Sequence, residues 1–225
     1  MLLAIDTATE TLSIALHDGD ALAAEITLHA DRRHSALLAP LIKRTMAQAE
    51  VSLDDLQALA VSVGPGSYTG TRIGVALAKG LAAPRDLPLA PVTTLETVLA
   101  AQPLRQDARP LVATVSAGRN RVIWAEYRCD SDAWVERRAP RISDWQTLLS
   151  EFNGPVRMSG EISPAGLTAI GLARAAGAQI DLAPGAQRIR RAGTLAEVAW
   201  RRLCESDASA FPADRVMPVY LQGPS

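Results

Sequence analysis

Two halves of this 225-residue chain repeat one order of predicted elements. In the first half, three short apolar runs predict consecutive strands, and Asp18-Gly19 provides the hairpin turn between the second and the third. Apolar residues then recur along residues 34–50 at the spacing of one helical face. A buried strand, a helix that ends before Pro84, a fifth strand and a third helix follow. This half therefore reads as β-β-β-α-β-α-β-α.

The second half shows the same order after the connecting segment QPLRQDARP. Its predicted elements are strands in PLVATVSAG, RVIWAEYRC and AWVERRA, a helix over residues 143–152, a strand at PVRMS, the helix PAGLTAIGLARAAG, a short strand in QIDLAP and the helix TLAEVAWRRLCE. A duplicated α/β unit of this order is typical of the two-lobed actin, Hsp70 and sugar-kinase (ASKHA, ribonuclease H-like) fold. We predict a first lobe over residues 1–102 and a degenerate second lobe over residues 103–225, whose last helix is free to pack back on the first lobe.

Composition and charge indicate a soluble globular protein. The chain is 48% hydrophobic and 21% charged, and its formal net charge of -1 argues against a generally basic nucleic-acid binder. Cys129 and Cys204 lack the CxxC spacing of a zinc site, which fits a reducing compartment. Asp6 interrupts the first apolar run, and no stretch approaches the ~18 apolar residues of a membrane span. We therefore expect a cytoplasmic protein without membrane association.

The first hairpin of each half is the first place to look for chemistry, because each lobe of this fold normally contributes a phosphate loop there. Asp6, Thr7 and Thr9 lie at a strand end and a turn, where a carboxylate can orient a metal-bound water and hydroxyl groups can hold phosphate. Asp and Thr also cap such turns in proteins without any catalytic role, so both interpretations stay open. Superposing the halves places Asp6-Thr7 over Ser116-Ala117, and the second half therefore lacks the acid.

Residues 64–72, GPGSYTGTR, form a glycine-rich turn that leads into a helix. The turn is not a Walker loop, because Thr71-Arg72 follows Gly70 where that motif has a lysine, and it is not a Rossmann fingerprint. Its glycines allow positive φ and close approach of the backbone at a helix amino terminus. The residues that we expect to retain a vestigial phosphate contact are Asp6, Thr7, Ser67, Thr69 and Gly70. The alternative is a sharp strand-to-helix turn, whatever binds there.

A stripe of small residues continues from this turn along the helix. Gly70, Gly74 and Ala78 are four residues apart, and Ala76 and Gly80 form a second, adjacent stripe. A glycine inside a helix costs about 1 kcal/mol relative to alanine, so several of them suggest a packing reason. We expect close contact of this helix with another element, either within the lobe or across an interface.

Neither metal binding nor nucleophilic catalysis is supported by the sequence. His29 and His34 are five residues apart, so they do not form the H-E-x-x-H pair of a metalloprotease. No G-x-S-x-G elbow occurs, and neither cysteine has the neighbours of a reactive thiol. We therefore expect no catalytic residue, no metal and no cofactor. Five arginines near the last helix favour a solvated surface over contact with tRNA or an acidic partner: Arg188, Arg190, Arg191, Arg201 and Arg202.

Five motifs of the chain together resemble the bacterial TsaB (YeaZ) family: AIDTATETLSIAL, RHSALLAPLI, AVSVGPGSYTGTRIGVALAKGLA, PLAPVTTLE and PVYL. The resemblance implies a non-catalytic partner of the transferase TsaD, required for threonylcarbamoyl modification of adenosine 37 in tRNAs that read codons beginning with A. It also implies TsaE as an ATPase in a larger complex, indirect contact with tRNA, and no peptidase activity. A small-molecule kinase or ATPase of the same fold, using Asp6 and the glycine loop, is the alternative.

The resemblance further implies a heterodimer with TsaD through the helices over residues 35–46 and 70–81. The residues expected at this interface are His34, Leu37, Leu38, Leu41, Ile42, Thr45, Gly70, Arg72, Ile73, Gly74, Leu77 and Leu81. We expect Arg72→Glu or Gly74→Leu to weaken this complex without unfolding the monomer. When TsaD is missing, an exposed apolar helix pair is expected to form a homodimer. The second half departs from many relatives, which have Asp-Ala-Arg where this chain has Ser116-Ala117-Gly118.

Overall fold

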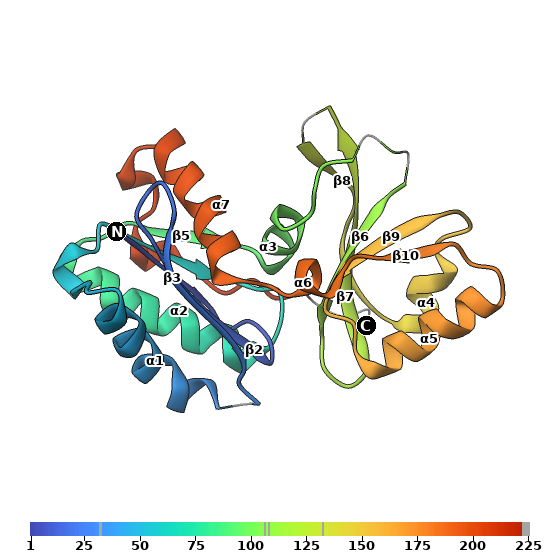
Figure 1. Ribbon diagram of the computed structural model, residues 1–225, viewed down its shortest axis with the longest axis horizontal. Helices are drawn as coiled ribbons and strands as arrows, with labels where there is room; N and C mark the ends of the chain where they lie inside the picture. The colour runs from blue at the N-terminus through green and yellow to red at the C-terminus, as the bar shows by residue number, and fades with distance from the viewer. Residues whose placement is uncertain (32, 106, 108, 132, 222–225) are drawn as a thin grey trace. The chain divides into compact units, whose positions relative to one another are not determined.

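The computed structural model describes residues 1–31, 33–105, 107, 109–131 and 133–221 (Figure 1). It has an α/β architecture with two five-stranded mixed sheets, each with helices of its own. The chain divides into two compact units, one formed by Met1–Thr97 with Arg190–Tyr220 and the other by Val98–Ile189 with Leu221. The predicted α/β class with two sheets is therefore confirmed. None of the helices described is both long and apolar enough to cross a bilayer.

The first sheet has the strand order β3-β2-β1-β4-β5. Its strands are β1 (Leu2–Asp6), β2 (Thr11–His17), β3 (Leu22–His29), β4 (Ala58–Ser62) and β5 (Leu89–Val92). The strands β1, β2 and β3 pair antiparallel, whereas β1, β4 and β5 pair in parallel. Parallel strands that are covered on both faces read as continuous apolar runs, and all five residues of β1 are buried.

Helices cover both faces of this sheet. Leu3 and Ile5 of β1 share a core with α1 (His34–Gln48) and α2 (Tyr68–Ala82). Leu2 and Ala4 point to the opposite face, because successive side chains of a strand alternate, and they pack against α7 (Ala192–Glu205). The central strand is therefore held between an early helix pair and a helix from the far end of the chain.

The second sheet has the order β10-β9-β6-β7-β8. Its strands are β6 (Leu111–Ser116), β7 (Arg121–Asp130), β8 (Ala133–Asp144), β9 (Val156–Gly160) and β10 (Ile180–Leu182). One face packs against α4 (Trp145–Ser150) and α5 (Pro164–Ala175), where Trp124 and Met158 meet Trp145 and Ile170. This lobe ends in α6 (Gly185–Arg188), a helix of four residues.

The lobe boundaries differ from the sequence-based division at residues 102 and 103. The first unit gives way to the second between Thr97 and Val98, within α3 (Thr94–Ala100). Residues 190–220 belong to the first unit rather than the second. The reason is the apolar side of α7, formed by Ala192, Leu195, Ala196 and Ala199, which is buried against the first sheet. The last predicted helix therefore completes the first lobe, and the repeat in the second half lacks a full final helix.

Candidate functional site

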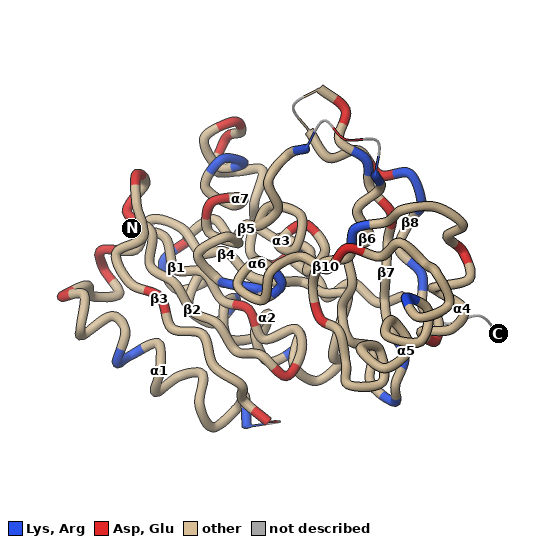
Figure 2. The backbone as a smooth tube through the Cα atoms, turned by 45° about the vertical axis from the view of Figure 1, so that its right-hand side comes forward, with Lys and Arg blue, Asp and Glu red and all other residues tan. Residues whose placement is uncertain are grey.

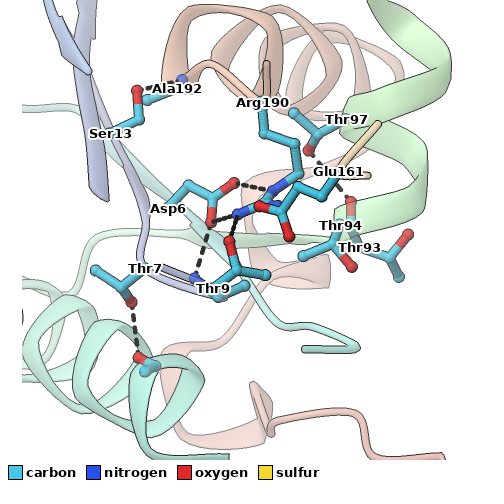
Figure 3. A network of polar contacts seen from close by, with 12 residues as sticks. Asp6, Thr7, Thr9, Ser13, Thr93, Thr94, Thr97, Glu161, Arg190 and Ala192 are labelled. Atoms are coloured by element: carbon cyan, nitrogen blue, oxygen red, sulfur yellow. Dashed lines mark hydrogen bonds and ion pairs between the residues drawn. The ribbon is translucent and has the colours of Figure 1, made fainter. Parts of the chain in front are cut away.

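Asp6 forms a buried ion pair with Arg190 at the carboxyl end of β1 (Figure 3). The guanidinium Nε donates to Asp6 Oδ2 at 2.9 Å, and Nη2 lies 3.4 Å from Oδ1 and donates to Thr9 Oγ1 at 2.8 Å. Asp6 Oδ1 also accepts a hydrogen bond from the backbone N–H of Ala8 at 2.9 Å. Both charged side chains are only 1% exposed. The acid that the sequence singled out is therefore bonded on both oxygens by groups of its own lobe.

This arrangement favours a structural role for Asp6 over a catalytic one. A carboxylate that orients a metal-bound water must offer an oxygen to the metal. Here a guanidinium supplies the positive charge instead, and burying such a pair is tolerated only with good geometry and additional hydrogen bonds, which Ala8 and Thr9 provide. No three His, Cys, Asp or Glu side chains gather as a metal site within the part of the chain that the structure describes.

The segment that carries Arg190 also begins α7, and the first sheet caps this helix from outside. Ser13 Oγ accepts from the N–H of Ala192 at 2.8 Å, and Glu25 Oε1 accepts from the N–H of Gly193 at 2.8 Å. These are orphan donors of the first helical turn, which a local cap usually satisfies. Glu25 also pairs with Arg191. Residues 190–193 are thus bound to β1, β2 and β3 by polar contacts, a role that the sequence analysis missed.

Thr7 connects the first hairpin to the glycine-rich turn. Its hydroxyl donates to the carbonyl of Gly70 at 2.8 Å. A Cβ added at Gly70 would lie 2.2 Å from the carbonyl oxygen of Thr7, and one at Gly74 would lie 2.3 Å from Thr7 Oγ1. A Cβ at Gly66 would similarly lie 2.2 Å from the carbonyl oxygen of Ala8. The glycines therefore let α2 and its preceding turn approach the hairpin within the lobe.

This geometry corrects the expectation that Gly70 and Gly74 face a partner. Both lie on the buried side of α2, and Gly74→Leu would collide with Thr7, so this substitution would disturb the monomer as well as any complex. The second stripe is different, because Ala76 and Gly80 are exposed and a Cβ at Gly80 would meet nothing within 4 Å. Only this second stripe is open to another molecule.

The turn itself is capped by its own side chain. Ser67 is the N-cap of α2, and its Oγ accepts from the N–H of Gly70 at 3.1 Å. One of the donors that a phosphate would use at a helix amino terminus is therefore already bonded. Thr69 lies exposed in the first turn. The structure brings Thr7, Ser67 and Gly70 together, while the Asp6 carboxylate is bound to Arg190.

The corresponding hairpin of the second lobe is built differently. Ser116 ends β6, as Asp6 ends β1, and its N–H donates to Glu161 Oε2 at 3.0 Å. The following turn passes through Gly118, Arg119 and Asn120, all with positive φ, at 66°, 50° and 61°. The structure thus places a serine and a left-handed turn at the position that the sequence comparison matched to Asp6-Thr7.

An apolar groove of about 480 Å³ lies between α1 and α2. Its lining residues are Ala39, Ile42, Lys43, Met46, Ala47, Val51, Leu53, Leu77 and Leu81. Of the residues predicted at an interface, Arg72 is exposed, and Leu37, Leu41, Ile73, Leu77 and Leu81 are half-buried. The other six are buried: His34, Leu38, Ile42, Thr45, Gly70 and Gly74. Of the half-buried residues, Leu77 and Leu81 also line the groove.

We predict that Arg190→Met lowers the free energy of unfolding by about 3–5 kcal/mol, because Asp6 is left buried without a counter-ion. Asp6→Asn should have a cost of the same order. Since the two side chains form one pair, the double variant should cost less than the sum of the single variants. Urea denaturation of the four proteins measures this coupling. Additive costs would contradict the pairing.

We predict opposite effects for two glycine-to-alanine substitutions in α2. Gly74→Ala should destabilise the protein by about 1–3 kcal/mol, because the new methyl group meets Thr7 Oγ1. Gly80→Ala is the matched control and should stabilise the helix by up to about 1 kcal/mol, because its Cβ enters open space. Thermal and urea unfolding of both variants test this. Equal effects at the two positions would refute the proposed contact.

A comparison with known proteins gives two kinds of sequence match. The model of the family described as TsaD, tRNA N6-adenosine threonylcarbamoyltransferase, matches residues 25–203. The chain is 38% identical over 131 residues to the tRNA threonylcarbamoyladenosine biosynthesis protein TsaB of Escherichia coli (strain K12), which covers 58% of this chain and 56% of that protein. It is 34% identical over 163 residues to TsaB of Bacillus subtilis (strain 168), which covers 71% and 70%. The chain thus spans less than two thirds of the first relative and more than two thirds of the second.

Solved structures resemble the chain over nearly its whole length. YeaZ from Pseudomonas aeruginosa superposes with a TM-score of 0.72 at 22% identity, covering 97% of this chain and 99% of that one. The activator of 2-hydroxyisocaproyl-CoA dehydratase from Clostridium difficile, solved with bound ADPNP, has a TM-score of 0.51 at 9% identity, covering 92% and 97%. At these identities the likeness shows the fold alone, and it confirms the predicted two-lobed fold class.

Proposed function

Because the chain belongs to the TsaB (YeaZ) family, we propose that it acts in the cytoplasm as a non-catalytic partner of TsaD in the threonylcarbamoyl modification of adenosine 37 in tRNAs reading codons that begin with A. The observation that carries this proposal is the contrast between two places in the first lobe. The carboxylate of Asp6 at the end of β1 is bound in an ion pair with Arg190, whereas the surface over α1 and α2 is apolar and open. The lobe is built to dock a protein rather than to activate a substrate.

The proposed docking surface is the open side of α1 and α2. Leu37, Leu41, Ile73, Leu77 and Leu81 are its apolar residues, and Arg72 adds a charge at its edge. The buried side of α1 carries His34, Leu38, Ile42 and Thr45, and Gly70 and Gly74 let α2 approach the first hairpin closely. An apolar groove with charged residues at its margin is the usual anatomy of an interface.

Charge favours an acidic partner for this surface. The helix α1 contains Lys43 and Arg44, α2 contains Arg72 and Lys79, and neither helix contains Asp or Glu (Figure 2). Two copies of the same surface would bring like charges together, so a homodimer in the absence of TsaD is the weaker of the two assemblies. TsaE would join the larger complex, and tRNA would be contacted indirectly.

A reconstituted modification assay with TsaD, TsaE and threonylcarbamoyl-adenylate tests this proposal. We predict that Ala39→Arg, which places a charged side chain in the groove, weakens TsaD binding at least about tenfold and lowers tRNA modification in parallel. Its unfolding transition should not move, because Ala39 is exposed. The matched control is Ala139→Arg on the exposed edge strand β8, which should bind normally. If the unmodified chain neither bound TsaD nor restored tRNA modification, the proposal would be wrong.

A small-molecule kinase or ATPase remains the alternative, and it requires Asp6 to act on Mg-ATP. Since Asp6 is bonded to Arg190, Ala8 and, through Arg190, to Thr9, we predict no heat of binding and no turnover when Mg-ATP is added to the chain alone. Calorimetry and a phosphate-release assay measure this. Tight binding with turnover would establish the enzyme instead.

A further inference from the structure

Arg72 contacts two tyrosines on the exposed side of α2. Its Nε donates to the hydroxyl of Tyr220 at 3.0 Å, and its guanidinium carbon lies 4.1 Å from the ring centroid of Tyr68. The two rings contact each other, with centroids 5.0 Å apart. A surface arginine usually has much rotamer freedom, which binding must remove. Here two contacts restrict the side chain before any partner arrives, and this lowers the cost of binding.

Tyr220 reaches Arg72 because residues 214–220 lie along α2. The N–H of Val219 donates to the carbonyl of Val63 at 2.7 Å, and Lys79 Nζ donates to the carbonyl of Asp214 at 2.9 Å. Val216 is buried in the core between these points. Gly64 leaves room for the segment, since a Cβ there would lie 2.8 Å from the carbonyl oxygen of Val219. The segment is therefore hydrogen-bonded to the lobe near both of its ends, at Asp214 and at Val219.

The guanidinium has a defined recognition edge left. Nε is bonded to Tyr220 and one face of the plane lies on Tyr68, while the two terminal nitrogens have no hydrogen-bond partner among the residues that the structure describes. Their spacing matches the two oxygens of a carboxylate. Such a fork also fits phosphate. The surroundings decide between the two, and they include large exposed apolar side chains: Met217 at 66%, Tyr68 at 56%, Tyr220 at 43% and Val219 at 41%.

This composition fits a protein rather than RNA. Tyr, Arg and Met are enriched at protein interfaces, and aromatic and arginine anchors dominate their energetics. Binding to a phosphate backbone depends on many cations, whereas α1 and α2 carry four in all. We infer that Arg72, clamped between Tyr68 and Tyr220, receives an aspartate or glutamate carboxylate of the docking protein, and that residues 214–220 are a positioning segment for this anchor. This inference rests on the proposed function.

The test measures TsaD binding by surface plasmon resonance for two conservative variants. Arg72→Lys keeps the charge but loses the fork, and affinity should fall about tenfold. Tyr220→Phe keeps the ring but removes the hydroxyl that orients Arg72, and affinity should fall roughly threefold to tenfold, mainly through faster dissociation. Arg201→Lys on the exposed side of α7 is the matched control and should bind like the unmodified chain. Arg72→Met should also flatten the dependence of affinity on salt, which a purely structural role would not do.

The outcomes separate this inference from the proposed function. If the unmodified chain does not bind TsaD, the proposed function fails. If it binds and both conservative variants bind equally well, the function stands and the arginine anchor is overturned. If the variants keep TsaD binding but lose tRNA in a filter-binding assay of the assembled complex, Arg72 takes a phosphate and the carboxylate inference is also overturned. Unchanged unfolding curves for both variants confirm that a loss of binding is local.

Discussion

The buried pair of Asp6 and Arg190 is the interaction on which the first lobe depends. It joins the end of the first strand to a residue 184 positions later, and neither charge can stay in the interior without the other. With Arg190 in this position, Ser13 and Glu25 accept hydrogen bonds from N–H groups in the first turn of α7. The helix then packs against the face of the sheet opposite α1 and α2. The same pair turns the acid at the end of β1 into a structural residue. One ion pair therefore both joins the two ends of the lobe and occupies the carboxylate of Asp6.

A second constraint acts on the opposite face of the same sheet. Thr7 lies so close to Gly70 and Gly74 that no side chain fits between α2 and the first hairpin at these positions. This fixes which side of α2 is open, namely the side with Arg72, Ala76 and Gly80. For the proposed docking surface, a helix held by such close contacts lowers the cost of binding, because less ordering is left to be done. The glycines that suggest a phosphate loop in the sequence thus serve an internal contact.

Much of the fold is predictable because periodic apolar patterns are local. The strands, the helices α1 and α2 and the duplicated order follow from such patterns, and the match to TsaB relatives supports the same fold. The sequence leaves open whether α7 packs on the first lobe, because an apolar helix face does not say which sheet will cover it. Arg190 was likewise one of five arginines in the same stretch of sequence, and only the distance to Asp6 separates it from its exposed neighbour Arg191. The sequence also does not show that Gly70 and Gly74 are buried whereas Gly80 is exposed, since spacing alone cannot tell the buried side of a helix from the exposed one.

The first lobe is discontinuous in sequence, and this has a consequence for its synthesis. Leu2 and Ala4 emerge from the ribosome early, but the helix that covers them is made only after the whole of the second unit. One face of the first sheet must therefore stay uncovered while Val98–Ile189 is translated, whereas that unit is contiguous apart from its last residues and can fold as it appears. We therefore expect the second unit to fold first, while one apolar face of the first sheet stays uncovered until α7 is made.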